Sequence, residues 1–168
     1  MVEKEESIEA AWAKVETQYQ RRSDLIPNIV ETVKGYADFE QETLTGVIEA
    51  RSKATSIQVD PSNLSPEAIA NFQKAQSQLT GALSRLLVTV ERYPDLKANQ
   101  QFSQLQAQLE GTENRIAVAR DRYNEAVQDY NSYIRKFPKN IVAGMFDFEK
   151  KGYFESDPGT ENAPKVDF

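Results

Sequence analysis

The feature that most constrains this chain is a spacing of apolar residues that alternates between three and four positions over two long stretches. The first stretch runs from Ile69 to Val90, and the second runs from Phe102 to Phe137. A period of about 3.5 residues puts one narrow apolar face on each helix and favours antiparallel partners that cross at about 20°. The sequence therefore predicts an all-α fold of long, packed helices.

Local signals give the expected helix boundaries. Ser65 precedes Pro66, which is the order of an N-cap followed by proline at the first helical position. The last long helix is expected from about Asn99 to Lys136, and at 1.5 Å per residue it would be roughly 57 Å long. A first helix is expected from about Glu3 to Arg22.

Proline at position 27 removes a backbone donor, so the sequence predicts a kink or a restart there. The helical segment that follows is expected to end near Ile57. Four helical segments then form an antiparallel up-and-down bundle over residues 1–138. Residues 139–168 are expected to be a short apolar piece and an extended tail that either packs on the bundle or is disordered, with Tyr153, Phe154, Val166 and Phe168 as its anchors.

Composition excludes several kinds of site. The chain contains no His and no Cys, which removes the usual zinc sites, haem ligation through His, and Ser-His or Cys-His nucleophiles. Its 26 acidic residues exceed its 20 basic ones, giving a net charge of -6 without a basic patch, so a nucleic-acid partner is not expected. We expect no cofactor, no metal and no catalysis. No apolar run is long enough to span a bilayer.

Three groups of residues are candidates for interaction. The first could bind an anion at the break near Pro27, or, as we favour, pair with nearby acids and carbonyls. The second lies in the turn between the two long helices, and the loop after Phe137 is a further candidate. The third is a seam of two tyrosines whose neighbours Asn124 and Asn131 suggest a buried polar ladder that fixes helix register; the alternative is a ligand pocket. The groups are Arg21, Arg22 and Asp24; Tyr93, Pro94 and Leu96; and Tyr123 and Tyr130.

Several sequence blocks match one known pattern in the same order. The blocks are residues 12–16, 20–36, 49–51, 93–98, 122–124, 130–131, 137–138, 153–155 and 164–168. The second block reads QRRSDLIPNIVETVKGY and is the most specific. Together these blocks cover nearly the whole chain, which resembles the LemA family.

The resemblance implies a bacterial helical bundle with bromodomain-like topology, anchored in the cell membrane by a single N-terminal transmembrane helix. Residues 1–168 lack such a helix, and we expect this sequence to begin just after it. Which side of the membrane the domain faces, and its oligomeric state, stay open. The family brings no catalytic residues to carry over. We therefore expect a scaffold or adaptor that binds another protein of the cell envelope; the alternative is a bundle that binds a small molecule or a lipid.

Overall fold

The computed structural model describes residues 1–36 and 39–155, and within these ranges all regular secondary structure is helical. The prediction of an all-α fold is confirmed. The six helices are α1 (Val2–Lys34), α2 (Gln41–Ser56), α3 (Pro66–Val90), α4 (Pro94–Lys97), α5 (Gln100–Arg135) and α6 (Lys139–Met145). Within the described residues, none of these helices combines the length and the apolar character that crossing a membrane requires. The expected anchors Val166 and Phe168 lie outside the described residues.

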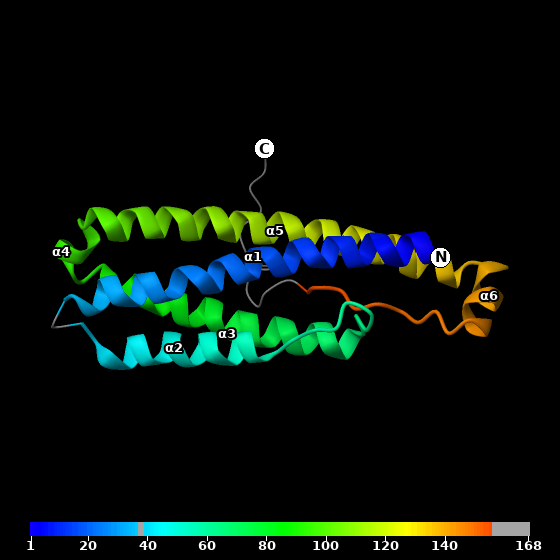
Figure 1. Cartoon of the computed structure of the whole chain (residues 1–168), viewed down its shortest axis with the longest axis horizontal. Helices are drawn as coiled ribbons and strands as arrows, with labels where there is room; N and C mark the ends of the chain where they lie inside the picture. The colour runs from blue at the N-terminus through cyan, green and yellow to red at the C-terminus, as the bar shows by residue number, and fades with distance from the viewer. Residues whose placement is uncertain (37–38, 156–168) are drawn as a thin grey trace, which may run out of the picture.

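Two pairs of helices form the body of the molecule. The long helices α1 and α5 lie side by side and run in opposite directions, and the shorter α2 lies along α3 (Figure 1). The short helix α4 turns the chain from α3 into α5 at one end. At the other end α6 follows α5, close to the N-terminus of the chain (Figure 1).

The two expected helix starts, at Pro66 and near Asn99, are present. The Ser65 hydroxyl accepts a hydrogen bond from the Ala68 amide at 3.2 Å, and Pro66 occupies the first helical position. The Asn99 side chain caps α5 by accepting from the Phe102 amide at 2.9 Å. Each cap satisfies a backbone donor that has no partner inside its helix.

The predicted restart at Pro27 is wrong. Helix α1 continues through Pro27 and ends at Lys34, and α2 begins only at Gln41. Proline cannot donate to the carbonyl of Ser23, four residues earlier. Arg51 of α2 supplies the missing donor, because its Nε lies 2.9 Å from the Ser23 oxygen. A partner from another helix therefore compensates for the proline.

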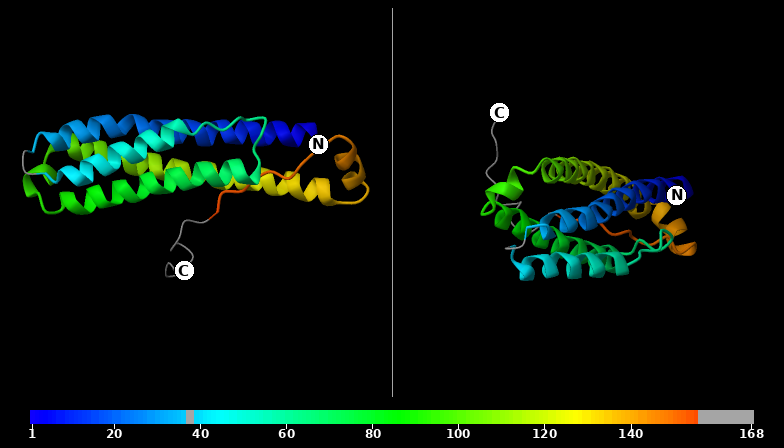
Figure 2. Two further views of the ribbon diagram at one scale, coloured as in Figure 1. Left: turned by 90° about the horizontal axis from the view of Figure 1, so that it is seen from below. Right: turned by 60° about the vertical axis from the view of Figure 1, so that its left-hand side comes forward.

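The interior consists of two clusters that lie end to end. The cluster near α4 is mainly aliphatic and is enclosed by α1, α2, α3 and α5. The cluster near α6 is rich in aromatic residues and is formed by the first half of α1, the start of α3, the second half of α5 and Phe154. With 16 residues against 33 in α1, α2 is about 24 Å long and cannot extend over both clusters. The loop between α2 and α3 and the segment after α6 pass along the second cluster (Figure 2).

Candidate functional site

The segment that follows α6 turns back along the bundle and lies between α3 and α5 (Figures 1 and 2). We call residues 149–155 the docked tail. It has no regular secondary structure, so its backbone groups need partners elsewhere. One of them is the Gly152 amide, which donates to the Leu64 carbonyl at 2.9 Å. The tail lies so close to the start of α3 that a Cβ at Gly152 would be 2.8 Å from the Pro66 Cα.

Carboxamide side chains on the two flanking helices bond the backbone of the docked tail. Asn131 accepts from the Lys151 amide at 3.0 Å and donates to its carbonyl at 3.1 Å. Asn124 does the same with Phe154, at 2.8 Å in both directions. From α3, Gln73 accepts from the Glu155 amide at 2.9 Å and donates to the Glu155 carbonyl. We call Gln73, Asn124 and Asn131 the carboxamide ladder.

The tyrosine seam also binds the tail. The Tyr123 hydroxyl donates to the Gly152 carbonyl and the Tyr130 hydroxyl to the Glu149 carbonyl, both at 2.9 Å. Burial raises the pKa of both phenols above the ordinary value. At Tyr130 the negative charge of Glu5 adds to that shift. The tail therefore occupies the position where the sequence suggested either a register device between helices or a pocket.

Phe154 is the apolar anchor of the tail. Its ring stacks on Trp12 with centroids 6.0 Å apart and meets Tyr123 edge-on at 5.3 Å and Phe72 at 6.2 Å. The Arg120 guanidinium lies 5.0 Å from the same ring. Three helices that are distant in sequence, α1, α3 and α5, thus converge on one buried phenylalanine.

Arg22 lies at the boundary between the two interior clusters and is buried. Its Nη1 donates to Thr80 at 2.7 Å and to Glu113 at 3.1 Å. Its Nη2 donates to the carbonyl and to the side chain of Gln76, at 3.1 and 2.7 Å. The guanidinium joins α1, α3 and α5, so it is not accessible to an external anion or partner.

The other candidates do not join Arg22 in one site. Arg21 and Asp24 are exposed on α1, and the Asp24 carboxylate accepts from Gln20 at 2.9 Å. In the turn between α3 and α5, Leu96 is completely buried, so it cannot contact a partner.

The remaining residues of that turn are more accessible. Tyr93 packs on Phe39 with ring centroids 4.9 Å apart, and Pro94 is exposed. The structure thus places the three candidate groups at the middle of α1, at the α4 end and beneath the docked tail.

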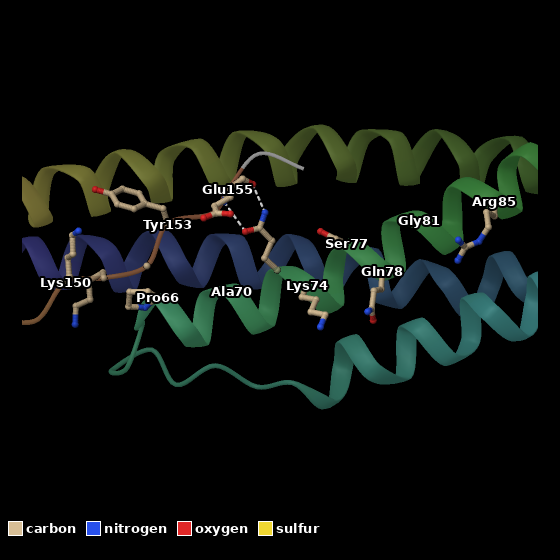
Figure 3. Close-up of a pocket in the computed structure, with 13 residues that line it drawn as sticks. Pro66, Ala70, Lys74, Ser77, Gln78, Gly81, Arg85, Lys150, Tyr153 and Glu155 are labelled. Carbon is tan, nitrogen blue, oxygen red and sulfur yellow. Dashed lines mark hydrogen bonds between the residues drawn. The ribbon is translucent and has the colours of Figure 1, made fainter. Parts of the chain in front are cut away.

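An open groove of about 780 Å³ runs beside the docked tail, along the outer face of α3 (Figure 3). Lys74, Gln78 and Arg85 point to one side of α3, and Lys150 lies at the end opposite Arg85 (Figure 3). Within residues 1–36 and 39–155, no ion pair involves Lys74, Arg85 or Lys150. Lys151 lines the groove as well, but it pairs with Glu5 at 3.4 Å. The groove is therefore lined by four basic residues, Lys74, Arg85, Lys150 and Lys151, and one acidic residue, Glu155, on a chain that is acidic overall.

Sequence reasoning singled out Asn124 and Asn131 as a polar ladder between helices, but it did not find Gln73, the tail as their partner, or the groove. Both depend on where residues 149–155 dock, and helical periodicity says nothing about a segment that is not helical. The available signal was the pairing of Tyr with Asn seven residues apart. Across the part of the chain that the structure describes, no group of three or more acidic side chains is arranged to hold a metal ion.

Comparison with known proteins gives one family and a small set of relatives. The model of the LemA family matches residues 11–168. Protein LemA of Metamycoplasma hominis is 28% identical over 149 residues, which is 89% of this chain and 64% of that protein. Magnetosome proteins MamQ 1 and MamQ 2 of Paramagnetospirillum magneticum are each 25% identical over 172 residues, or 91% of this chain and 62% of theirs. The chain thus spans less than two thirds of the length of each of these relatives.

Proposed function

This chain belongs to the LemA family, and on that premise we propose that it is a non-enzymatic scaffold of the bacterial cell envelope that binds an acidic segment of another protein in the groove beside α3. The proposal includes a single membrane anchor that precedes Met1, and a bromodomain-like, up-and-down arrangement of the four long helices. The observation that carries it is the cationic groove of about 780 Å³.

The groove has the properties of a peptide site. Its volume is within the range of pockets that hold ligands, and its cations are spread along its length, which suits an extended chain more than a compact anion. The docked tail offers a precedent inside the molecule, because the same helices already hold an extended segment. Electrostatic attraction would speed the encounter and select acidic partners.

The anchor is supported by the position of the N-terminus. Helix α1 starts at Val2 and its first residues lie at the α6 end of the bundle, so a preceding segment would leave the molecule there (Figure 1). The groove along α3 faces the side of the bundle, where a partner could approach without crossing that end (Figure 3).

The alternative, a pocket for a small molecule or lipid at the tyrosine seam, has less support. Tyr123 and Tyr130 are fully buried and bonded to the docked tail. A ligand would have to displace residues 149–154 and their hydrogen bonds first.

The test is competition for partners captured from the native membrane. The membrane-anchored form is crosslinked and purified from its own cell envelope, with residues 1–168 added as competitor. Wild-type competitor should displace the specific partner, and a Lys74→Glu/Arg85→Glu competitor should need about tenfold or more of the concentration. The matched control is Arg21→Glu/Lys53→Glu, which changes net charge equally at exposed positions outside the groove. Equal displacement by both double variants would refute the groove as the site.

A further inference from the structure

A cluster of large apolar side chains is exposed at one end of the molecule. The Phe137 side chain is 79% exposed, that of Met145 74% and that of Phe146 68%, and all lie within ten residues. We call this cluster the apolar tip; it consists of Phe137, Ile141, Val142, Met145 and Phe146. Other exposed apolar residues of the bundle, such as Val88 and Val118, lie singly on different helices. Scattered exposed residues are ordinary, whereas a contiguous exposed cluster marks an interaction surface.

The apolar tip projects from the bundle. Helix α6 lies beyond the end of α1, so the tip is the outermost part of the molecule at that end (Figure 1). An apolar depression of about 400 Å³, lined by Met1, Val2, Pro138, Val142 and Phe148 among others, extends this surface to the N-terminus. The whole end of the bundle therefore offers apolar surface to its surroundings.

Basic residues flank the apolar tip. Three basic residues, Arg135, Lys136 and Lys139, adjoin the tip in sequence, and Asp147 and Glu149 follow it, although the whole chain carries -6. Arg135 and Lys136 are exposed just before the tip, and Lys139 lies 4.0 Å from the centre of the Tyr133 ring. The acidic residues Glu3 and Glu6 belong to the nearby start of α1.

We propose that the apolar tip inserts into the surface of a lipid bilayer with anionic headgroups. Apolar side chains that project from a surface between basic ones are the arrangement of a peripheral membrane contact: the apolar groups enter the acyl boundary and the cations meet the phosphates. A second copy fits less well, because self-association would bring two sets of basic residues together. This inference goes beyond the scaffold function and does not depend on an N-terminal anchor, since residues 1–168 contain the entire tip.

The test is flotation of residues 1–168 with vesicles of phosphatidylcholine and phosphatidylglycerol, and with vesicles of phosphatidylcholine alone. The wild type should float with the mixed vesicles and bind the neutral ones more weakly. The variant Ile141→Ser/Met145→Ser/Phe146→Ser should lower the partition coefficient about tenfold or more. The matched control, Ile48→Ser/Val88→Ser/Val118→Ser, removes exposed apolar groups from the helices of the bundle and should bind as the wild type does.

A second readout reports insertion directly. Trp12 is the one tryptophan in the chain and is 1% exposed, so the tryptophan introduced by Phe146→Trp is the one that lipid can reach. Brominated acyl chains should quench its emission. Binding without quenching would mean that charge alone attracts the protein and would overturn the proposal. So would a wild type that ignores both kinds of vesicle while self-associating through the tip in sedimentation analysis.

Discussion

The two halves of the bundle bury their interiors with different side chains and different backbone elements. In the α4 half, four helices enclose a mainly aliphatic cluster, and most backbone groups are paired within their own helix. In the α6 half, α2 has ended, and the loop that follows it and the docked tail cover an aromatic cluster. An extended segment has no internal hydrogen bonds, so its partners must come from the side chains around it.

This difference explains where the side chains that bond a non-helical backbone lie. The carboxamide ladder and the two seam tyrosines all lie in the α6 half, and each bonds the docked tail. Aromatic rings are suited to that half because they fill a large volume and, as in tyrosine, carry a polar group at the tip. The comparison teaches that one bundle can hold a non-helical segment if its helices offer side chains that mimic a neighbouring strand.

The largest effect is expected from Trp12→Ala, which removes the ring against which Phe154 stacks. We expect a loss of about 3–5 kcal/mol in the free energy of unfolding, measured by urea denaturation with circular dichroism. Hydrogen exchange should also show residues 149–155 losing protection under native conditions, before the helices do.

Leu86→Ala in the aliphatic half is the control for that experiment. It should cost a comparable 2–5 kcal/mol, while the tail opens no sooner than the helices around it. If both variants expose the tail to the same degree, the aromatic cluster is not what holds it, and the contrast between the halves fails.

Asn131→Asp is expected to cost about 2–3 kcal/mol at neutral pH, because a buried carboxylate cannot donate to the Lys151 carbonyl. Burial would raise the pKa of the introduced acid in the folded state. The penalty should therefore shrink as the pH falls toward about 4, where the protonated acid can donate again. Thermal unfolding across pH measures this. Asn114→Asp, exposed on the same helix, should stay within about 0.5 kcal/mol of the wild type throughout.

The sequence predicts the helices of this protein better than it predicts the extended segment, residues 149–155. The caps at Ser65 and Asn99 act over three residues, so they can be recognised locally. The continuity of α1 through Pro27 depends on Arg51, which is distant in sequence and interrupts the apolar stripe of its own helix. Likewise Asn124 and Asn131 looked like contacts between helices, because no periodic pattern marks residues 149–155 as their partner. What local signals cannot reveal is a donor or acceptor supplied from another element.

Substitutions at two glycines test the same comparison between the halves with smaller expected changes in free energy. A Cβ at Gly152 would lie 2.8 Å from both the Pro66 Cα and the Ser65 carbonyl, which are backbone atoms that cannot rotate away. Gly152→Ala should therefore weaken tail docking by about 1–3 kcal/mol, seen as faster exchange of residues 149–155. At Gly81 on α3 a Cβ meets nothing within 4 Å. Gly81→Ala should raise global stability by about 0.5–1 kcal/mol; a loss there would mean that α3 needs the glycine for another reason.

The last effect is expected at alkaline pH, and it depends on two tyrosines that both lie in the α6 half. Burial raises the pKa of Tyr123 and Tyr130 in the folded state, so the unfolded chain loses these protons first. Their contribution to stability is complete below the ordinary tyrosine pKa of about 10 and declines as the pH rises above it. By about pH 11 the loss should approach roughly 1.4 kcal/mol for Tyr123, and be smaller for Tyr130. Comparison with Tyr123→Phe/Tyr130→Phe isolates it, because that variant lacks both phenols and should show a flatter dependence of unfolding free energy on pH. Parallel curves for the two proteins would show that the hydroxyls ionise without disturbing the tail, and that the aromatic packing around Phe154 holds it in place.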